Sequence, residues 1–325
     1  MKKTRILVIG AGGQIGSELT PALRKVYGSE HVVASDIKSD ICEQVLNEGP
    51  FEILDCMDEH RLIEVIIQYK ITRVYHLVAL LSAVGEHKPL MAWNINVGSL
   101  MNVLEIAREL HLSVFIPSSI GAFGPSTPKK NTPQDTLMRP TTIYGITKVC
   151  GEMLGDYYFK KYGVDTRGLR YPGIISNATQ PGGGTTDYAV EIFYKALEEG
   201  RYTCYLKEDT YLDMMYMPDA VRSAIEVMEA DPDKLVHRNA FNVSAMSFSP
   251  RELKAEIQKH IPDFQMECKP DPVKQAIADS WPDNMDDSAA RQEWGWNHEY
   301  DLSKMTEDML KTLKNRQKHH EEISS

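Results

Sequence analysis

The sequence has few cysteines, no long apolar run and no excess of basic residues. Its five cysteines include no closely spaced pair, which argues for reduced thiols and against a structural zinc site. Without an apolar run of about 18 residues, no transmembrane helix is expected. Lys plus Arg number 36 and Asp plus Glu number 46, which gives a net charge of −10. We therefore expect neither a membrane nor nucleic acid as a partner.

The beginning of the chain also lacks the features of a signal peptide. Only the short stretch Ile6–Ile9 is apolar there, whereas a signal peptide needs a longer apolar segment and a cleavage site of small residues. Together with the scattered cysteines, this predicts a cytoplasmic protein. A transit peptide removed earlier would leave no trace in this sequence.

What the sequence does contain is an ordinary globular balance, with 42% apolar and 25% charged residues. In the first half, short apolar runs alternate with helical patterns. The predicted strands are Arg5–Ile9, His31–Ser35, Phe51–Asp55, Arg73–Leu77, Ser113–Pro117 and Thr166–Arg170. The predicted helices are Gln14–Val26, Glu59–Tyr69, Ala92–Leu110 and Thr142–Tyr162. This alternation predicts an α/β fold, a doubly wound parallel sheet of the Rossmann type with helices on both faces.

The pattern changes after Tyr171. We expect residues 1–171 to form the Rossmann domain and residues 172–325 to form a smaller C-terminal substrate-binding lobe, partly interleaved with the sheet. The lobe is predicted to hold a helix near Thr186–Glu199 and strands near Tyr202–Leu206, Tyr211–Tyr216 and Ala240–Val243. The polar tail, residues 311–325, is expected to be the fraying end of a helix.

A glycine-rich turn, GAGGQIG, joins the first predicted strand to the first helix. Gly10 allows a tight turn, Gly13 lets the backbone approach a pyrophosphate, and Gly16 lets the helix pack closely on the strand. The N-terminus of the helix offers free N–H groups and the positive end of its dipole to phosphates. A turn of this kind can also serve structure alone, so its context has to decide.

That context includes Asp36, which ends the second strand 20 residues after the glycine motif. A carboxylate there accepts hydrogen bonds from ribose hydroxyls and repels a 2′-phosphate, which favours NAD over NADP. Lys38 softens this preference slightly. After the third strand, Asp55 can meet the adenine edge. After the fourth, we expect the small Ala79 and its neighbour Leu80 to contact the cofactor.

The predicted catalytic groups are a tyrosine, a lysine and a serine. Tyr144 and Lys148 are four residues apart on a predicted helix and share one face. A phenol has a pKa of about 10, but a nearby ammonium stabilises the phenolate and lowers that pKa. Such a tyrosine can take a proton from an alcohol while hydride leaves the same carbon. Of two serines that end the fifth strand, Ser118 and Ser119, we favour Ser119 as the group that holds the substrate oxygen.

These motifs together resemble the extended short-chain dehydrogenase/reductase family, which includes sugar-nucleotide epimerases. The resemblance covers nearly the whole chain and also rests on the stretch 96–102, Phe123-Gly124 and RYPG at 170–173. It implies that Ser119, Tyr144 and Lys148 form a catalytic triad and that NAD is the cofactor. The predicted cofactor contacts are Gly10, Gly13, Gln14, Ile15, Gly16, Asp36, Asp55, Leu77, Ala79, Leu80, Asn96, Tyr144, Lys148 and Tyr171.

Motifs of the C-terminal lobe are similar to those of a narrower group, the metal-independent L-threonine 3-dehydrogenases. They are PGGGTTDY at 181–188, DSWP at 279–282, DDSAAR at 286–291, WGW at 294–296 and YDL at 300–302. This resemblance implies NAD-dependent oxidation of the β-hydroxyl of L-threonine to L-2-amino-3-oxobutanoate, without a metal. Tyr144 would be the base, and Lys148 would lower its pKa and hold the nicotinamide ribose.

The same resemblance implies where the substrate binds and how the chains pair. The implied substrate residues are Ser82, Ser119, Tyr144, Thr186 and Trp281, with the loop 182–186 as a lid. Trp281 is as consistent with a place in the core as with one facing the substrate, whereas Trp294 and Trp296 are expected in the core. A homodimer is expected through the helices Ala92–Leu110 and Thr142–Tyr162.

Two other functions stay open on the residues alone. A nucleotide-sugar 4-epimerase or dehydratase of the same family would retain NAD through turnover and release no NADH. A non-catalytic, NAD-sensing regulator on the same fold would need only the glycine turn and Asp36.

Overall fold

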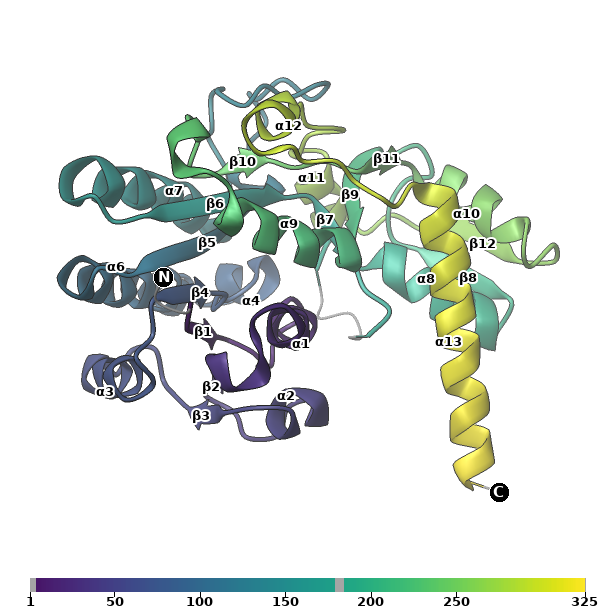
Figure 1. Cartoon of the computed structure of the whole chain (residues 1–325). Helices are drawn as coiled ribbons and strands as arrows, with labels where there is room; N and C mark the ends of the chain where they lie inside the picture. Colours follow the sequence, from purple (N-terminus) through teal and green to yellow (C-terminus); the bar gives the residue numbers. More distant parts are fainter. Residues whose placement is uncertain (1–3, 179–183, 325) are drawn as a thin grey trace.

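The computed structural model describes residues 4–178 and 184–324 (Figure 1). Within these residues, a central sheet of seven parallel strands runs in the order β10-β6-β5-β4-β1-β2-β3. The strands are β1 (Ile6–Ile9), β2 (Val32–Asp36), β3 (Phe51–Ile53), β4 (Arg73–His76), β5 (Ser113–Ser119), β6 (Thr166–Tyr171) and β10 (Phe241–Asn242). The predicted doubly wound Rossmann sheet is confirmed.

Helices cover both faces of this sheet, and the alternation of side chains along β1 shows how. All four residues of β1 are buried. Leu7 and Ile9 join the core under α3, α6 and α7, whereas Ile6 and Val8 join the core under α1, α9 and α12. Apolar side chains on both faces are typical of a parallel strand between two helical layers. The helices are α1 (Gly16–Tyr27), α3 (Glu59–Tyr69), α6 (Ser99–Leu110), α7 (Ile143–Tyr162), α9 (Met217–Glu229) and α12 (Ser288–Trp294).

One predicted helix, Ala92–Leu110, is wrong as a continuous α-helix. The structure has α5 (Pro89–Trp93), then a π-helical turn, η2 (Asn94–Gly98), and only then α6. A π-helical turn holds one residue more than an α-helical turn and is common at functional sites. Here it buries Asn96, whose amide bonds the backbone of Leu80 and the hydroxyl of Thr147.

Beyond Tyr171 the chain builds the lobe and twice returns to the main sheet. The lobe holds two small sheets, β11-β9-β7 and β12-β8. Their strands are β7 (Gly173–Ile175), β8 (Arg201–Cys204), β9 (Leu212–Tyr216), β11 (Met246–Phe248) and β12 (Gln265–Cys268), of which β7, β11 and β12 were not predicted. The helices of the lobe are α8 (Tyr188–Glu198), α10 (Pro250–Gln258), α11 (Pro272–Ala278) and α13 (Leu302–Ser324). The first return brings α9, which covers one face of the main sheet, and β10, which pairs with β6. The second return brings α12 to the same face as α9.

Short elements complete the described chain, and α13 stands at its outer side in Figure 1. These elements are η1 (Ser29–His31), α2 (Glu43–Asn47), α4 (Ser82–His87), η3 (Ile120–Ala122) and η4 (Pro232–Lys234). None of the described helices is both long and apolar enough to cross a membrane.

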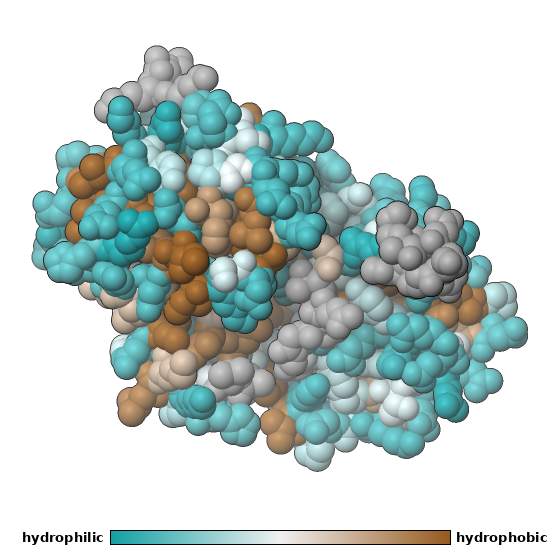
Figure 2. Space-filling view, turned by 90° about the horizontal axis from the view of Figure 1, so that it is seen from below, coloured by the Kyte–Doolittle hydropathy of each residue, from teal (hydrophilic) through white to brown (hydrophobic). Residues whose placement is uncertain are grey.

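The surface of the Rossmann half is not uniformly polar. Figure 2 shows brown, apolar residues gathered mostly over that half of the molecule. Part of the apolar surface lies along α5 and α7, which pack against each other. The exposed apolar side chains of these two helices are Leu90, Met91, Trp93, Ile146, Met153, Tyr157 and Tyr162.

Candidate active site

The glycine turn between β1 and α1 has the shape that the sequence predicts. Gly10 has a φ of +86°, a conformation that L side chains rarely adopt. A Cβ on Gly16 would lie 2.3 Å from the carbonyl oxygen of Gly10, so no side chain fits there. Asp36 closes the turn from β2, because its Oδ2 accepts a hydrogen bond of 2.9 Å from the N–H of Gly12. The turn therefore leaves bare backbone where a pyrophosphate has to approach.

A cavity of about 290 Å³ lies next to this turn, at the carboxyl ends of β1, β4, β5 and β6. In doubly wound sheets, ligands bind at this end of the strands. The cavity is lined by most of the predicted site residues, from both halves of the chain. They are Gly10, Gly13, Gln14, Ile15, Gly16, Leu77, Ala79, Ser82, Ser119, Tyr144, Lys148, Tyr171, Thr186 and Trp281.

Four predicted cofactor residues do not line this cavity. Asp36 bonds the glycine turn, and Asp55 accepts a hydrogen bond from the N–H of Met57. Asn96 lies behind the cavity wall, where it holds both the N–H and the carbonyl of Leu80. Asn96 thus braces the segment after β4 at Leu80. Cofactor contact by these four stays a prediction.

Tyr144 and Lys148 both point into the cavity from α7. The helix begins beside them, because the hydroxyl of Thr142 accepts from the N–H of Gly145 and caps the first turn. The ammonium of Lys148 lies 5.5 Å from the centre of the Tyr144 ring and donates to the carbonyl of Pro117 at 2.8 Å. The expected shared face of the helix is therefore present.

The pKa values of this pair depart from the simple expectation. Burial lowers the pKa of Lys148 to about 8, and the carboxylate of Glu152 acts in the opposite direction. Burial raises the pKa of Tyr144, while a hydrogen bond with Ser119 opposes that rise. Without a bound cofactor, burial and Ser119, rather than Lys148, are therefore the main influences on the pKa of Tyr144. Two buried groups this close titrate as a coupled pair, so removing the phenol proton favours a charged lysine.

The two serines of β5 have separate tasks. The Oγ of Ser119 accepts from the N–H of Gly121 at 3.1 Å, which leaves its hydrogen free to donate toward Tyr144 and the cavity. Ser118 also reaches the cavity wall, but its hydroxyl donates to the buried carboxylate of Glu152. This geometry supports the choice of Ser119.

The lobe also contributes to the wall of the cavity. Thr186 and Trp281 line it, and the Trp281 side chain is only 7% exposed. Of the predicted lid, residues 182 and 183 lie outside the described residues. Gly184 is held by Asp187, whose Oδ2 accepts from its N–H at 2.6 Å, and by the hydroxyl of Tyr205. Trp296 is buried in the core beside α9, as predicted, whereas Trp294 is half-buried and packs against that core.

The prediction from sequence missed a buried network behind the site. Glu152 and Arg170 form an ion pair of 2.8 Å, both almost fully buried, and Glu152 also receives the hydroxyl of Ser118. Glu152 is one helical turn beyond Lys148, so the spacing 144, 148, 152 could have indicated it. His76, at the end of β4, lies near Lys148 and was missed because no motif marks it.

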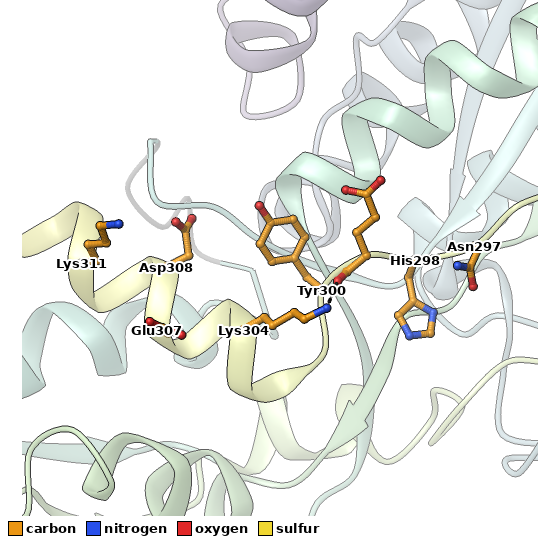
Figure 3. Close-up of a pocket in the computed structure, with 8 residues that line it drawn as sticks. Asn297, His298, Tyr300, Lys304, Glu307, Asp308 and Lys311 are labelled. Carbon is orange, nitrogen blue, oxygen red and sulfur yellow. Dashed lines mark hydrogen bonds between the residues drawn. The ribbon is translucent and has the colours of Figure 1, made fainter.

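A larger hollow, of about 700 Å³, lies elsewhere, at the start of α13. Figure 3 shows that its side chains do not converge on one point: His298 and Glu307 point away from Tyr300 and Asp308. Lys304 is engaged with the carbonyl of Glu299. In the part of the chain that the structure describes, no three His, Cys, Asp or Glu side chains are grouped so that they could hold a metal ion. We therefore place the candidate site at the glycine turn.

Comparison with known proteins decides the family. The family profile described as "NAD dependent epimerase/dehydratase family" matches residues 6–244. The chain belongs to this family. The match spans both the glycine turn and the triad residues, and it confirms the predicted family. The family description also agrees with the prediction of NAD.

Members of this family that are similar to the chain include proteins of known structure. An epimerase/dehydratase of Staphylococcus haemolyticus is 55% identical over 96% of this chain and 98% of its own. The structure of L-threonine dehydrogenase from Clostridium difficile is 55% identical, with a TM-score of 0.94 over 97% of this chain and 99% of the other. The holo form of a GalE-like L-threonine dehydrogenase from Cupriavidus necator is 51% identical, with a TM-score of 0.92 over 95% and 99%. The narrower resemblance found in the lobe motifs is confirmed by these similarities.

Proposed function

We propose that this protein is an NAD-dependent L-threonine 3-dehydrogenase, which oxidises the β-hydroxyl of L-threonine to L-2-amino-3-oxobutanoate. One observation carries the proposal: Ser119, Tyr144 and Lys148 line the same cavity as the glycine turn. Similarity over nearly the full chain to L-threonine dehydrogenases supports the choice of substrate.

The residues present fit NAD. The glycine turn is free of side chains where phosphates would approach, and Asp36 is held at the end of β2, where a ribose would bind. The ammonium of Lys148 has donors beyond the one given to Pro117. When bound, NAD supplies the hydride acceptor of the oxidation.

The chain's own residues then handle the proton and the orientation of the substrate. Ser119 donates a hydrogen bond toward the β-oxygen, because the N–H of Gly121 already occupies one lone pair of its hydroxyl. Tyr144 takes the hydroxyl proton as the general base. Lys148 keeps the phenolate stable with its charge, and Glu152 helps to keep that charge on the buried lysine.

The lobe selects the substrate. A cavity of about 290 Å³ is at the small end of the usual range for ligand sites, which suits an amino acid beside the reactive end of a cofactor. We propose that Ser82, Thr186 and Trp281 surround the amino acid. The indole of Trp281 shields the site from water, which strengthens the electrostatic interactions inside.

The test is to incubate the purified protein with NAD and follow NADH on addition of L-threonine, D-threonine, L-serine or L-3-hydroxybutyrate. We expect turnover with L-threonine well above the rest. UDP-galactose serves as the opposing substrate. Its conversion to UDP-glucose without NADH release would show an epimerase, and NAD binding without turnover of any substrate would show a sensor; either result contradicts the proposal.

We also propose a homodimer through α7 and the helical stretch α5–α6. Leu90 is 80% exposed and Met153 66% exposed on these neighbouring helices, an arrangement that favours burial against a second copy. Sedimentation analysis should give twice the mass of the chain, and Met153→Glu should shift it to the monomer. A wild-type protein that stays monomeric and active would contradict this part of the proposal.

A further inference from the structure

A second, much smaller cavity shares Pro117, Ser118 and Lys148 with the main cavity and includes no residue of the glycine turn. Its volume is about 20 Å³, and its lining is half apolar and half polar. The polar residues come from four elements and are His76, Asn96, Ser118, Thr147 and Lys148. A cavity needs about 10–15 Å³ to hold one water molecule, and the water needs two to four polar partners. This cavity therefore has the volume for a single water and polar groups in its lining that could bond it.

The hydrogen bonds around His76 indicate which of its ring nitrogens carries the hydrogen and which lacks a partner. The hydroxyl of Ser99 donates to the carbonyl of Ile95 at 2.5 Å, so its oxygen is left to accept from the Nε2 of His76 at 3.0 Å. His76 is neutral, because burial and the nearby charge of Lys148 lower its pKa to about 3. A neutral imidazole carries one N–H, which is then on Nε2. Nδ1 is a bare acceptor, and it is buried without a partner among the described protein atoms.

Lys148, by contrast, has hydrogen-bond donors that lack acceptors. Its ammonium carries three N–H donors, and the described structure gives it one acceptor, the carbonyl of Pro117. Ser118, next in the chain, donates its hydrogen to Glu152 and keeps a lone pair. A donor-rich ammonium, a bare imidazole nitrogen and a free hydroxyl lone pair thus surround one water-sized space.

We infer that one ordered water bridges the Nζ of Lys148 to the Nδ1 of His76, and that His76 is a positioning residue for the catalytic lysine. The water accepts from Lys148 and donates to His76 Nδ1 and to the Oγ of Ser118. The chain beyond His76 passes to Ser99, which bonds the carbonyl of Ile95 and the thiol of Cys56, and burial raises the pKa of that thiol. Because this path leads only to buried groups, the water is an anchor for the ammonium rather than an exit for the proton.

The inference rests on the proposed function only where activity is the readout. The direct test is a high-resolution crystal structure of the wild-type protein with NAD. We expect density for one water within hydrogen-bond distance of both Lys148 Nζ and His76 Nδ1. Nitrogen NMR should show the Nε2–H form of His76, unprotonated across the neutral range. A dry cavity, or a proton on Nδ1, would overturn the inference whatever the substrate proves to be.

The functional test is His76→Leu, which removes the acceptor at nearly constant volume. The charged lysine then loses part of its stabilisation, so less charge faces the phenol. We expect kcat/KM to fall about tenfold, on the scale of one lost buried hydrogen bond. The rising limb of the pH profile should move to higher pH, because a less charged Lys148 stabilises the phenolate less. The titratable groups that face Lys148 are Tyr144 and Glu152 of its own helix and His76 of β4.

Two further variants separate positioning from general damage to the fold. His76→Asn places an amide oxygen near the former Nδ1 and should restore most of the activity and the wild-type pH profile. His31→Leu makes the same exchange at a buried histidine at the opposite end of the strands and should leave the pH profile unchanged. A normal pH profile in His76→Leu, or equal shifts in both leucine variants, would contradict a positioning role. An inactive wild-type enzyme would refute the proposed function but leave the crystallographic test intact.

Discussion

The Rossmann half and the C-terminal lobe meet in one cavity but place their residues by different means. In the first half, Asp36 ends β2, Ala79 follows β4 and Ser119 ends β5, while Tyr144 and Lys148 lie at the start of α7. In the lobe, Thr186 and Trp281 come from loops whose positions depend on contacts far along the chain. Under the proposed function, the first half would bind the cofactor and move the proton, and the second would bind the substrate. Variants should therefore divide into those that change the rate or cofactor use and those that change KM for the substrate.

The largest effect is expected from Tyr144→Phe, which removes the base from the Rossmann half. Turnover of L-threonine should fall about 10³-fold or more, because general base catalysis contributes about 10²–10⁴-fold. NAD affinity should change little, as titration followed by fluorescence would show. Tyr157→Phe, an exposed change on the same helix, is the control and should be neutral. Near-normal turnover in Tyr144→Phe would remove Tyr144 as the base.

Lys148→Met should lower kcat/KM about 10²-fold near neutral pH. Without the ammonium the phenolate is less stable, so the apparent pKa of the base rises and the loss is greatest at low pH. Because burial holds the pKa of Lys148 at about 8, the wild-type enzyme itself loses the charge at higher pH, and the two profiles should converge there. A constant ratio across the pH range would contradict this role. Lys161→Met, near the end of α7, is the control.

Asp36→Ala tests the cofactor side of the same half. The carboxylate's hydrogen bonds to a ribose contribute about 1.5–3 kcal/mol, so KM for NAD should rise about tenfold or more. Removing its charge should also narrow the preference for NAD over NADP. KM for L-threonine should stay within about twofold. An unchanged ratio of NAD to NADP use would refute the ribose interpretation.

The smallest effect is expected in the lobe, from Trp281→Leu. KM for L-threonine should rise about three- to tenfold as the pocket loses apolar contact, while NAD affinity stays the same. Trp296→Leu is the matched change in the core of the Rossmann side. It should lower the melting temperature without this selective rise in KM. If both variants act alike, the division between the two halves does not hold.

The Rossmann half and the lobe also differ in how much of their structure could be predicted from the sequence. The predicted helix Glu59–Tyr69 has its observed ends, because apolar residues recur there at helical spacing and Asp58 caps the first turn in the structure. The strands that end at Asp36 and Ser119 could also be predicted from the sequence, since short strands buried on both faces are continuously apolar. Those elements owe their form to local sequence.

The parts that escaped prediction depend on distant contacts. β7, β11 and β12 have three or four residues each and gain order only by pairing with β9 or β8. Glu152 and His76 look like ordinary polar residues in the sequence, and only the fold shows that both are buried against Lys148. The π-helical turn at Asn94–Gly98 was hidden because its residues continue an acceptable helical pattern.

That turn limits how this part of the gene can vary. One residue fewer between Asn94 and Gly98 would restore an unbroken α-helix and rotate everything on one side by about 100° relative to the other. The amide of Asn96 would leave both Leu80 and Thr147, which it now joins across two elements. Substitutions can accumulate on the exposed side of these helices, whereas a single-codon deletion would separate the segment after β4 from the helix that carries Tyr144.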